Sequence, residues 1–280
     1  MASIGQRNAL QVIREATPGL YLDGENLGEI LLPRRYIPEN TGPGDYVLVF
    51  VHRDSEDRLV ATTEIPMVRV GEFASLKVVS VDARMGAFLD WGLTKDLLLP
   101  IREQSGPLMA GESVVVYVML DPASERIVAT TRLDFHLDLT SAEYEPNQKV
   151  QLLVATETSL GFKAIVENTH WGLLFKSDLG APLTIGQTLD GYIRAVRPDG
   201  KLDLSLTPSG YSRVRPLTEQ ILERLKLNNG QLAISDRSSP ELILKEFHTS
   251  KKAFKQALGA LYRQRKIRLT DQGIETVGNS

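Results

Sequence analysis

The sequence predicts a multidomain, mainly β protein in which three small five-stranded barrels precede a C-terminal α+β module. The main observation is an internal repeat: the stretch Gly19-Leu20-Tyr21-Leu22-Asp23 is matched by Gly86-Ala87-Phe88-Leu89-Asp90, 67 residues later. A weaker third copy places Gly161 75 residues after Gly86. A repeat this long exceeds those of solenoid proteins, so each unit is expected to have its own core. After residue 206 the hydrophobic period changes from two to about 3.6, which marks the helical module.

The first two units, residues 1–66 and 67–134, each contain five short apolar runs separated by turn sequences. The runs are rich in β-branched residues, which favour strands, and Pro43-Gly44-Asp45 has the composition of a turn. Five strands in about 65 residues is the number expected of a small Greek-key barrel of the OB-fold type. The strands are predicted at 10–13, 19–22, 29–32, 47–51 and 59–63, and then at 74–80, 87–90, 97–99, 114–119 and 127–131.

The third unit, residues 147–209, follows a stretch with little periodicity at 135–146 that is predicted to be a linker. Its last hairpin is the clearest, because Arg197-Pro198-Asp199-Gly200-Lys201 is a turn sequence and residues 202–206 alternate strictly. A third OB-fold barrel is therefore predicted. Its strands are expected at 149–155, 162–167, 172–176, 189–196 and 201–206.

Residues 210–280 are predicted to form a winged-helix domain. Apolar residues at helical spacing begin at Leu217, and Asn229-Gly230 is a typical helix stop. Ser238 and Glu241 fit a capping box before a short second helix, and Ser250 is placed to cap a third. Three helices followed by a hairpin are a winged-helix plan. The later helices are predicted at 240–247 and 251–264, and the hairpin strands at 267–269 and 274–277, around the turn Asp271-Gln272-Gly273.

The composition is that of an ordinary globular protein, with 42% hydrophobic residues. No apolar run approaches the roughly 18 residues that a membrane span needs. Residues 1–7 are polar and lack the apolar core of a signal peptide. The chain has no cysteine, which excludes disulfides, cysteine-bound metals and a thiol nucleophile. We therefore expect a cytoplasmic protein without a membrane partner.

The charge is distributed unevenly along the chain, although the net charge is only −3. Residues 1–140 carry 13 basic and 20 acidic side chains, net −7, whereas residues 211–280 carry 13 basic and 7 acidic side chains, net +6. Such an asymmetry is typical of a protein with a polyanion-binding end. A solvated, lysine-rich surface would give the same numbers, and charge alone does not separate the two interpretations.

The second repeat resembles an S1-type RNA-binding domain. The resemblance rests on residues 85–93, on Lys95-Asp96-Leu97-Leu98-Leu99-Pro100, and on Gly111-Glu112 before a valine-rich strand. Three such units followed by a winged helix resemble the conserved virulence factor B family of bacteria over nearly the whole chain. This resemblance implies S1-like OB-fold barrels, a winged-helix domain, RNA binding, and post-transcriptional control of gene expression, including virulence regulation. It implies no catalytic activity.

The resemblance also predicts which barrels bind RNA. Many S1 domains place an aromatic residue and a histidine on neighbouring strands that face the nucleic acid. The histidine position is occupied here by Leu32, Leu99 and Phe175 in the three units. The first two barrels are therefore expected either to bind RNA weakly or to serve as packing modules, whereas the third keeps an aromatic side chain beside His170 and Trp171.

The candidate binding residues are aromatic side chains beside basic ones, because single strands stack their bases on aromatic faces while cations neutralise the phosphates. Core aromatics and solvated surface charges are the alternative interpretation for each of them. The candidates in the second barrel are Phe88, Trp91 and Lys95. Those in the third are Phe162, Lys163, His170, Trp171, Phe175, Lys176, Arg194 and Arg197. Those in the winged helix are Lys251, Lys252, Lys255, Gln256, Arg263, Lys266 and Arg268.

The sequence gives little support for catalysis. Its 4 histidines lack the paired spacing of metal ligands, and it has neither a glycine-rich phosphate loop nor a nucleophile elbow. We expect no enzyme activity, no cofactor and no bound metal. The expected partners are single-stranded RNA, DNA through the winged helix, and RNA-processing or ribosome-associated proteins. A DNA-binding transcription regulator, a protein-interaction scaffold, and an accessory factor of an RNA-processing complex or ribonuclease remain alternatives.

Overall fold

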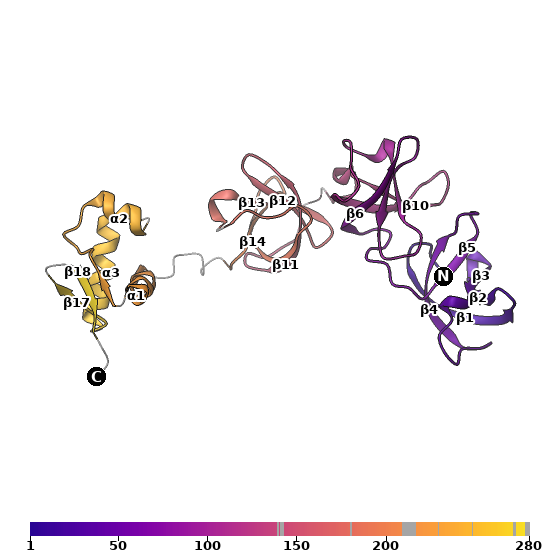
Figure 1. Ribbon diagram of the computed structural model, residues 1–280, viewed down its shortest axis with the longest axis horizontal. Coiled ribbons are helices and arrows are strands. Elements are labelled where there is room, and N and C mark those ends of the chain that lie inside the picture. The colour runs from indigo at the N-terminus through magenta and orange to yellow at the C-terminus, as the bar shows by residue number, and fades with distance from the viewer. Residues whose placement is uncertain are drawn as a thin grey trace. The chain divides into compact units, whose positions relative to one another are not determined.

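The computed structural model describes residues 1–138, 140, 143–179, 181–208, 217–228, 230–247, 249–270 and 273–277. The chain divides into two units, Met1–Leu206 and Thr207–Ser280 (Figure 1). The first contains three closed β-barrels and the second a three-stranded sheet with helices, which confirms the predicted fold class. In the described part of the chain, no helix combines the length and apolar character needed to cross a membrane. The predicted 209/210 boundary, helix end at Asn229 and turn at Asp271-Gln272 lie outside the described residues.

The three barrels share one topology. In the first barrel β1 (Arg7–Ala16) pairs with β2 (Gly19–Asp23) and β4 (Tyr46–Arg53), β2 pairs with β3 (Glu29–Pro33), and β5 (Leu59–Thr62) closes the barrel between β3 and β4. The contact between β3 and β5 is parallel, and the same order with its parallel contact recurs in the other two barrels. The sequence repeat therefore corresponds to a repeated fold.

The first barrel comprises β1 (Arg7–Ala16), β2 (Gly19–Asp23), β3 (Glu29–Pro33), β4 (Tyr46–Arg53) and β5 (Leu59–Thr62). The second comprises β6 (Phe73–Asp82), β7 (Gly86–Asp90), β8 (Leu97–Pro100), β9 (Ser113–Leu120) and β10 (Ile127–Thr130). The third comprises β11 (Lys149–Glu157), β12 (Gly161–Val166), β13 (His170–Phe175), β14 (Thr188–Val196) and β15 (Leu202–Ser205). A short 3-10 helix follows the third strand of each barrel: η2 (Arg34–Tyr36), η3 (Ile101–Glu103) and η5 (Lys176–Asp178).

A glycine begins the second strand of every barrel because another backbone approaches it closely. A Cβ atom at Gly86 would lie 2.2 Å from the carbonyl oxygen of Leu99. Gly19 and Gly161 occupy the same position, where a Cβ atom would lie 2.0 Å and 1.9 Å from the equivalent carbonyl oxygens. No residue with a side chain fits there without a shift of the backbone, so the glycine that marks the repeat is a requirement of the barrel.

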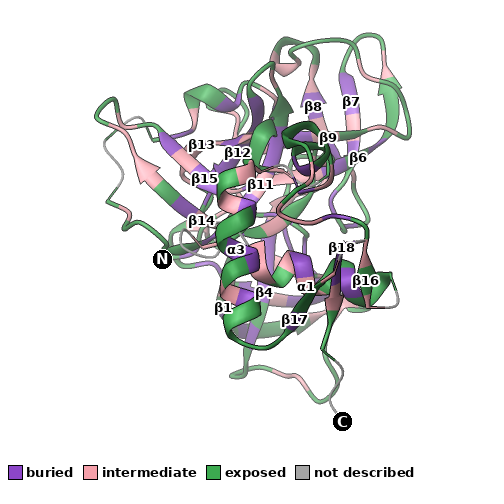
Figure 2. Cartoon of the chain, turned by 90° about the vertical axis from the view of Figure 1, so that its left-hand side faces the viewer, coloured by how far each residue is buried: buried purple, intermediate pink, exposed green. Residues whose placement is uncertain are grey.

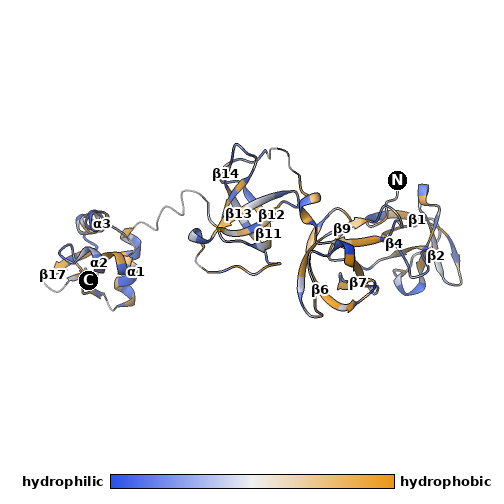
Figure 3. Cartoon of the chain, turned by 90° about the horizontal axis from the view of Figure 1, so that it is seen from above, coloured by the Kyte–Doolittle hydropathy of each residue, from blue (hydrophilic) through white to orange (hydrophobic). Residues whose placement is uncertain are grey.

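Alternate residues of the strands form the barrel cores, which leaves the intervening side chains on the outer surface (Figures 2 and 3). In the first barrel, for example, Leu20 and Leu22 of β2 and Ile30 and Leu32 of β3 are buried. Each such side chain contributes about 1.5–3 kcal/mol by leaving water. The side chains on the outer face of the second and third strands are therefore not needed for the core and can contact a ligand.

A buried contact joins the first two barrels. Phe50, from β4 of the first barrel, belongs to the hydrophobic core of the second, where its ring packs edge-on against Trp91 with the ring centroids 5.6 Å apart. Outside this contact, the Arg126 guanidinium of the second barrel pairs with the Asp57 carboxylate of the first at 2.6 Å. The two barrels therefore share a hydrophobic core, and an ion pair outside this core also joins them.

The second and third barrels are also in contact. The Asn168 side chain accepts a hydrogen bond from the Phe73 amide at 2.6 Å and donates one to the Gly71 carbonyl at 3.0 Å. In the stretch predicted to be a linker, Leu137 is buried in a cluster with residues of both barrels, just after η4 (Leu133–Phe135). The described part of this stretch therefore contributes to packing between the barrels.

The second unit has the elements of a winged helix: α1 (Leu217–Leu227), β16 (Gln231–Leu232), α2 (Pro240–Phe247), α3 (Lys251–Arg263), β17 (Ile267–Thr270) and β18 (Gly273–Thr276). The sheet order is β16-β18-β17, and the two-residue β16 was not predicted. The Ser250 side chain accepts from the Ala253 amide at 3.2 Å, which confirms the predicted cap of α3. For α2 the capping prediction was wrong by one residue: the Ser239 hydroxyl accepts from the Leu242 amide at 3.3 Å, whereas the Ser238 hydroxyl accepts from the Ser235 amide.

Candidate nucleic-acid interface

The outer face of the second and third strands is the same surface in all three barrels. Counted from the strand-opening glycine, Tyr21, Phe88 and Lys163 occupy one equivalent outward position. Phe162 precedes Lys163 and therefore occupies an inward position, where its ring is 3% exposed in the core of the third barrel. The structure thus leaves Phe162 no free ring face for a base, and Lys163 takes the position at which Phe88 stands in the second barrel.

The strand register corrects the assignment of the S1 histidine position. Gly161 pairs with Phe175, and by the same register Gly86 pairs with Pro100 and Gly19 with Pro33. The equivalent residues are therefore Pro33 and Pro100, not the preceding leucines, which are completely buried. Because side chains alternate along a strand, a shift of one residue exchanges the core face for the outer face.

In the second barrel, Phe88 is half-buried and lines a pocket of about 150 Å³. Met85 and Leu98 form apolar walls beside it, and Lys95 and Arg126 bring two cations to its rim. Apolar surface beside cations is the arrangement that single-strand binding requires. The Arg126 guanidinium, however, already makes two hydrogen bonds of 2.6 Å to the carboxylate of Asp57.

Trp91 and Lys95 have structural contacts at the junction of the first two barrels. Trp91 is 3% exposed, and its Nε1 donates to the Lys95 carbonyl at 2.6 Å, so no ring face is open to a base. The Lys95 ammonium donates to the backbone oxygens of Arg53 and Asp54 at 3.3 Å and 3.0 Å. Burial lowers the pKa of this ammonium, and the nearby positive charge of Arg126 lowers it further.

The third barrel has a larger pocket, of about 460 Å³, on the same outer face. Its apolar surface comes from Trp171 and the leucines Leu160, Leu173 and Leu202, and its polar rim includes Lys163, Lys201 and His170. The Lys163 ammonium lies over the Trp171 ring, 4.0 Å from the centroid, and 3.7 Å from the Asp134 carboxylate. Three predicted residues, Lys163, His170 and Trp171, therefore come together here.

Hydrogen bonds fix the orientation of the two rings in this pocket. Trp171 donates from Nε1 to the Asp134 carboxylate at 2.6 Å. Nδ1 of His170 lies 3.2 Å from the Tyr144 hydroxyl, and the two rings meet edge to face. Nε2 of His170 is buried and has no hydrogen-bond partner among the described residues. The pocket is thus preformed by contacts that do not involve a ligand.

The other candidates in the third barrel lie outside this pocket. The Arg197 guanidinium is 5.8 Å from the centroid of the half-buried Phe175 ring and pairs with a carboxylate at 2.8 Å. Lys176 pairs with Glu157 at 2.6 Å, and Arg194 pairs with Asp178. A phosphate must displace a carboxylate to reach any of these three cations.

The winged helix presents a basic face on α3. Its exposed side chains include Lys252, Lys255, Gln256 and Arg263, whereas the opposite face is buried around Phe254 (Figure 2). Lys251 is half-buried, and Lys266 and Arg268 are exposed at β17. Lys255 lies 4.0 Å from Asp236, and within the described residues the other cations of this group have no carboxylate at ion-pair distance. Apart from Lys255, these cations can meet phosphates without displacing a carboxylate of the described residues.

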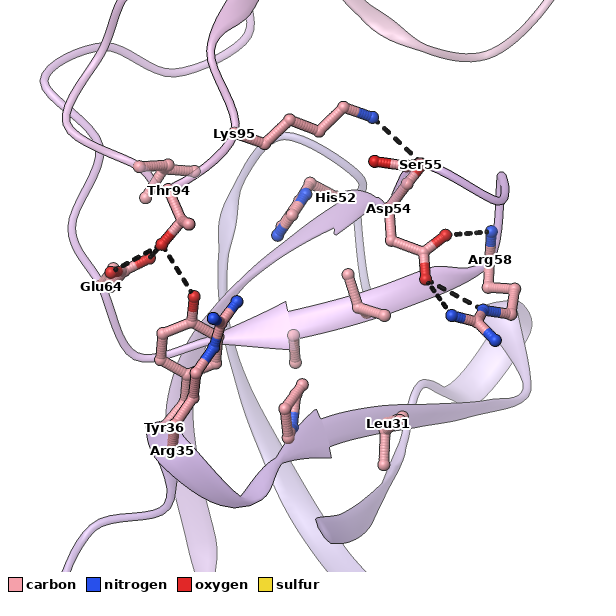
Figure 4. A pocket seen from close by; sticks show the side chains of 14 residues that line it. Leu31, Arg35, Tyr36, His52, Asp54, Ser55, Arg58, Glu64, Thr94 and Lys95 are labelled. Carbon is pink, nitrogen blue, oxygen red and sulfur yellow. Dashed lines mark hydrogen bonds and ion pairs between the residues drawn. The ribbon is translucent and has the colours of Figure 1, made fainter. Parts of the chain in front are cut away.

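A further pocket, of about 450 Å³, was not predicted (Figure 4). It lies where the first two barrels meet, and its lining includes Arg35, Tyr36 and His52 of the first barrel with Thr94 and Lys95 of the second. The sequence signal that could have indicated it is the basic and aromatic run that forms η2. No local pattern, however, places that run beside the second barrel.

Comparison with known proteins matches residues 4–64 and 70–132 to the family described as "S1 domain" and residues 219–275 to "CvfB-like winged helix domain". The chain is 31% identical over 279 residues to "Uncharacterized protein YitL" of Bacillus subtilis (strain 168), which covers 94% of this chain and 90% of that protein. It is 26% identical over 249 residues to "Conserved virulence factor B" of Staphylococcus aureus (strain N315), at 82% and 81% coverage. A solved multidomain protein with nucleic acid binding domains from Streptococcus pneumoniae is 25% identical, with 98% of both chains covered and a TM-score of 0.43.

Proposed function

The chain belongs to the conserved virulence factor B family, and from this premise we propose that it binds single-stranded RNA and acts in post-transcriptional control of gene expression. Its S1 domains support nucleic-acid binding in general. The choice of RNA, a cytoplasmic location and association with RNA-processing or ribosome-associated proteins are parts of the proposal.

The observation that carries the proposal is the preformed pocket around Trp171 in the third barrel. It combines an apolar surface, an aromatic ring and the cation Lys163 on the strand face with which OB-fold proteins bind oligonucleotides, whereas Lys201 at its rim is paired with Asp199 at 2.7 Å. Its volume of about 460 Å³ falls within the range of small-ligand pockets, so an unpaired base has room to enter. Paired bases are held in a stack, which favours a single-stranded ligand.

The proposed mechanism is stoichiometric binding without catalysis. Bases enter the pockets of the barrels, and the cations of α3 contact phosphates elsewhere on the same strand. Because the modules are linked in one chain, binding of one raises the effective concentration of the others, and the combined affinity exceeds that of any single module. Incubation of labelled RNA with the protein and Mg²⁺ is expected to leave the RNA uncut.

Fluorescence anisotropy of the full chain with a labelled single-stranded RNA, at two salt concentrations, tests the proposal. We expect RNA affinity to fall as the salt concentration rises. In Trp171→Ala the binding free energy should weaken by about 1–3 kcal/mol, because the stacking of one base is lost. Trp171→Phe keeps an aromatic ring and should therefore lose less RNA affinity than Trp171→Ala. Absence of binding at low salt contradicts the proposal, as does an unchanged affinity in Trp171→Ala.

A DNA-binding regulator is the second candidate, and the basic face of α3 favours it, since winged helices place such a helix against duplex DNA. Competition between duplex DNA and single-stranded RNA of equal length separates the two functions. Displacement of RNA by a lower concentration of duplex would support the DNA-binding function.

A further inference from the structure

The pocket between the first two barrels has the construction of a binding site (Figure 4). Its floor is apolar, formed by Leu31, Pro33 and Val60 on the outer face of the first barrel. Its walls are polar and come from both barrels. The volume of about 450 Å³ is within the range of small-ligand sites and nearly equal to that of the pocket around Trp171.

The pocket is fixed because the junction of the two barrels is fixed. Leu93, which lines the pocket, belongs to the shared core around Phe50 and Trp91. The Tyr36 hydroxyl of the first barrel lies 3.1 Å from the Thr94 hydroxyl of the second, and Thr94 is a further 3.4 Å from the Glu64 carboxylate. These bonds hold the Tyr36 ring in place without a ligand, which reduces the entropy lost when one binds.

The Arg35 guanidinium lies over the Tyr36 ring at one wall, and we call this pair the Arg35–Tyr36 platform. The Arg35 guanidinium carbon lies 4.5 Å from the centroid of the Tyr36 ring. Guanidinium planes as well as aromatic rings stack unpaired RNA bases. Arg35 is exposed and, among the described residues, has no carboxylate at ion-pair distance, so nothing competes with a ligand for it.

The charges of the pocket favour a phosphate between Arg35 and Lys95. The Arg58 guanidinium is neutralised by Asp54 at 2.7 Å and Glu56 at 2.8 Å. Lys95 contacts only backbone oxygens among the described residues and has no carboxylate partner there. Arg35 and Lys95, one from each barrel, are thus the lining cations without a carboxylate at ion-pair distance among the described residues, and Glu64 at the Thr94 wall is the lining carboxylate without a cation at that distance.

Lys95 and His52 line this pocket and also the neighbouring pocket of Phe88. A strand that passes from one pocket to the other therefore passes the Lys95 ammonium. We propose that the two pockets bind adjacent stretches of one RNA strand, with a base on the Arg35–Tyr36 platform, another on Phe88, and the phosphate backbone between them at Lys95. This inference rests on the proposed function and gives the first barrel a direct part in it.

The test uses Arg35→Gln in the full chain, with Arg34→Gln as its matched control. Arg34 is the adjacent arginine and is also exposed, but it donates to the Thr17 carbonyl at 2.8 Å, lies 3.6 Å from the Glu15 carboxylate and does not line the pocket. We expect Arg35→Gln to weaken binding of a labelled single-stranded RNA about tenfold and to reduce the salt slope by about 0.7, the value for one phosphate contact. Arg34→Gln should match the wild type in affinity, and the melting temperatures of both variants show whether they are folded.

Arg35→Lys separates the contribution of base stacking on the guanidinium from the contribution of its positive charge. It keeps the positive charge and so the salt slope, but the flat guanidinium is lost, and we expect about fivefold weaker binding. Wild-type affinity in both Arg35 variants, with weakened binding in Trp171→Ala, would overturn the inference and leave the proposed function standing. Absence of RNA binding by the wild type would instead overturn the proposed function. A free nucleotide that binds Arg35-dependently, with RNA affinity unchanged by Arg35→Gln, would also overturn the inference.

Discussion

The third barrel and the winged helix carry similar basic side chains but hold them differently. In the barrel, Lys176 and Arg197 lie within 2.8 Å of carboxylates, and Arg194 is paired as closely. On α3, Lys252 and Arg263 are exposed, and within the described residues neither has an ion-pair partner. A basic residue in the sequence is therefore not equivalent to a cation that a phosphate can use. If the proposed function holds, we expect base stacking at the barrels and most of the salt-dependent affinity at the winged helix.

The largest expected effect comes from removing the exposed cations of α3, of which Lys255 alone has a carboxylate at ion-pair distance within the described residues, Asp236 at 4.0 Å. The triple variant Lys252→Gln, Lys255→Gln and Arg263→Gln should lower the salt slope of RNA binding by about 2, at about 0.7 per phosphate contact on a single strand. Affinity at low salt should fall about 100-fold. The measurement is anisotropy across a salt series, with melting temperatures to confirm that the variant is folded.

The matched control removes three paired cations from the third barrel, with Lys176→Gln, Arg194→Gln and Arg197→Gln. Because each charge is already satisfied by a carboxylate, the salt slope should change by less than about 0.7. Equal losses of salt slope and affinity in the two triple variants would contradict the difference drawn between the barrel and the winged helix, because paired and unpaired cations would then contribute equally.

A smaller effect, a gain in RNA affinity, is expected when the charge of Asp134 is removed. Its carboxylate lies 3.7 Å from the Lys163 ammonium and accepts a hydrogen bond from Trp171 Nε1. Asp134→Asn keeps an acceptor for Trp171 but removes the charge that offsets Lys163, so RNA affinity should rise about threefold, as expected for one exposed charge pair. Asp138→Asn, at an exposed carboxylate that also lines the pocket, is the control for a general loss of negative charge. Equal gains in both variants would show that the specific pairing with Lys163 does not matter.

The sequence predicted the strands of the barrels because each strand has a strong local pattern and the pattern recurs. It did not determine on which face a single residue lies: Phe162 is buried, and the leucines assigned to the histidine position are one residue out of register. Alternation makes an error of one residue an error of face. β16 has only two residues and therefore no periodicity to detect.

The candidate site was predictable only where its residues lie close together in the sequence. Lys163, His170 and Trp171 come from neighbouring strands of one barrel and share a pocket. The pocket of Arg35 and Lys95 depends instead on Phe50 entering the core of the next barrel, a contact between segments that no local pattern connects. The ion pair of Arg126 has the same origin, because its partner is Asp57 of another barrel.

The smallest expected effect concerns the pH dependence of that last pair. The hydrogen bond from Arg126 lowers the pKa of the Asp57 carboxyl below its ordinary value of 3.8. A carboxyl with a depressed folded-state pKa contributes stability above pH 3.8 that is lost as the pH falls through the folded-state value. The melting temperature of the barrels should therefore decrease less between pH 5 and pH 3 in Asp57→Asn than in the wild type. Glu39→Gln, at an exposed carboxylate, should follow the wild type. If Asp57→Asn also follows the wild type, Arg126 is not held by Asp57, and the second barrel then offers phosphates a cation as free as those of α3.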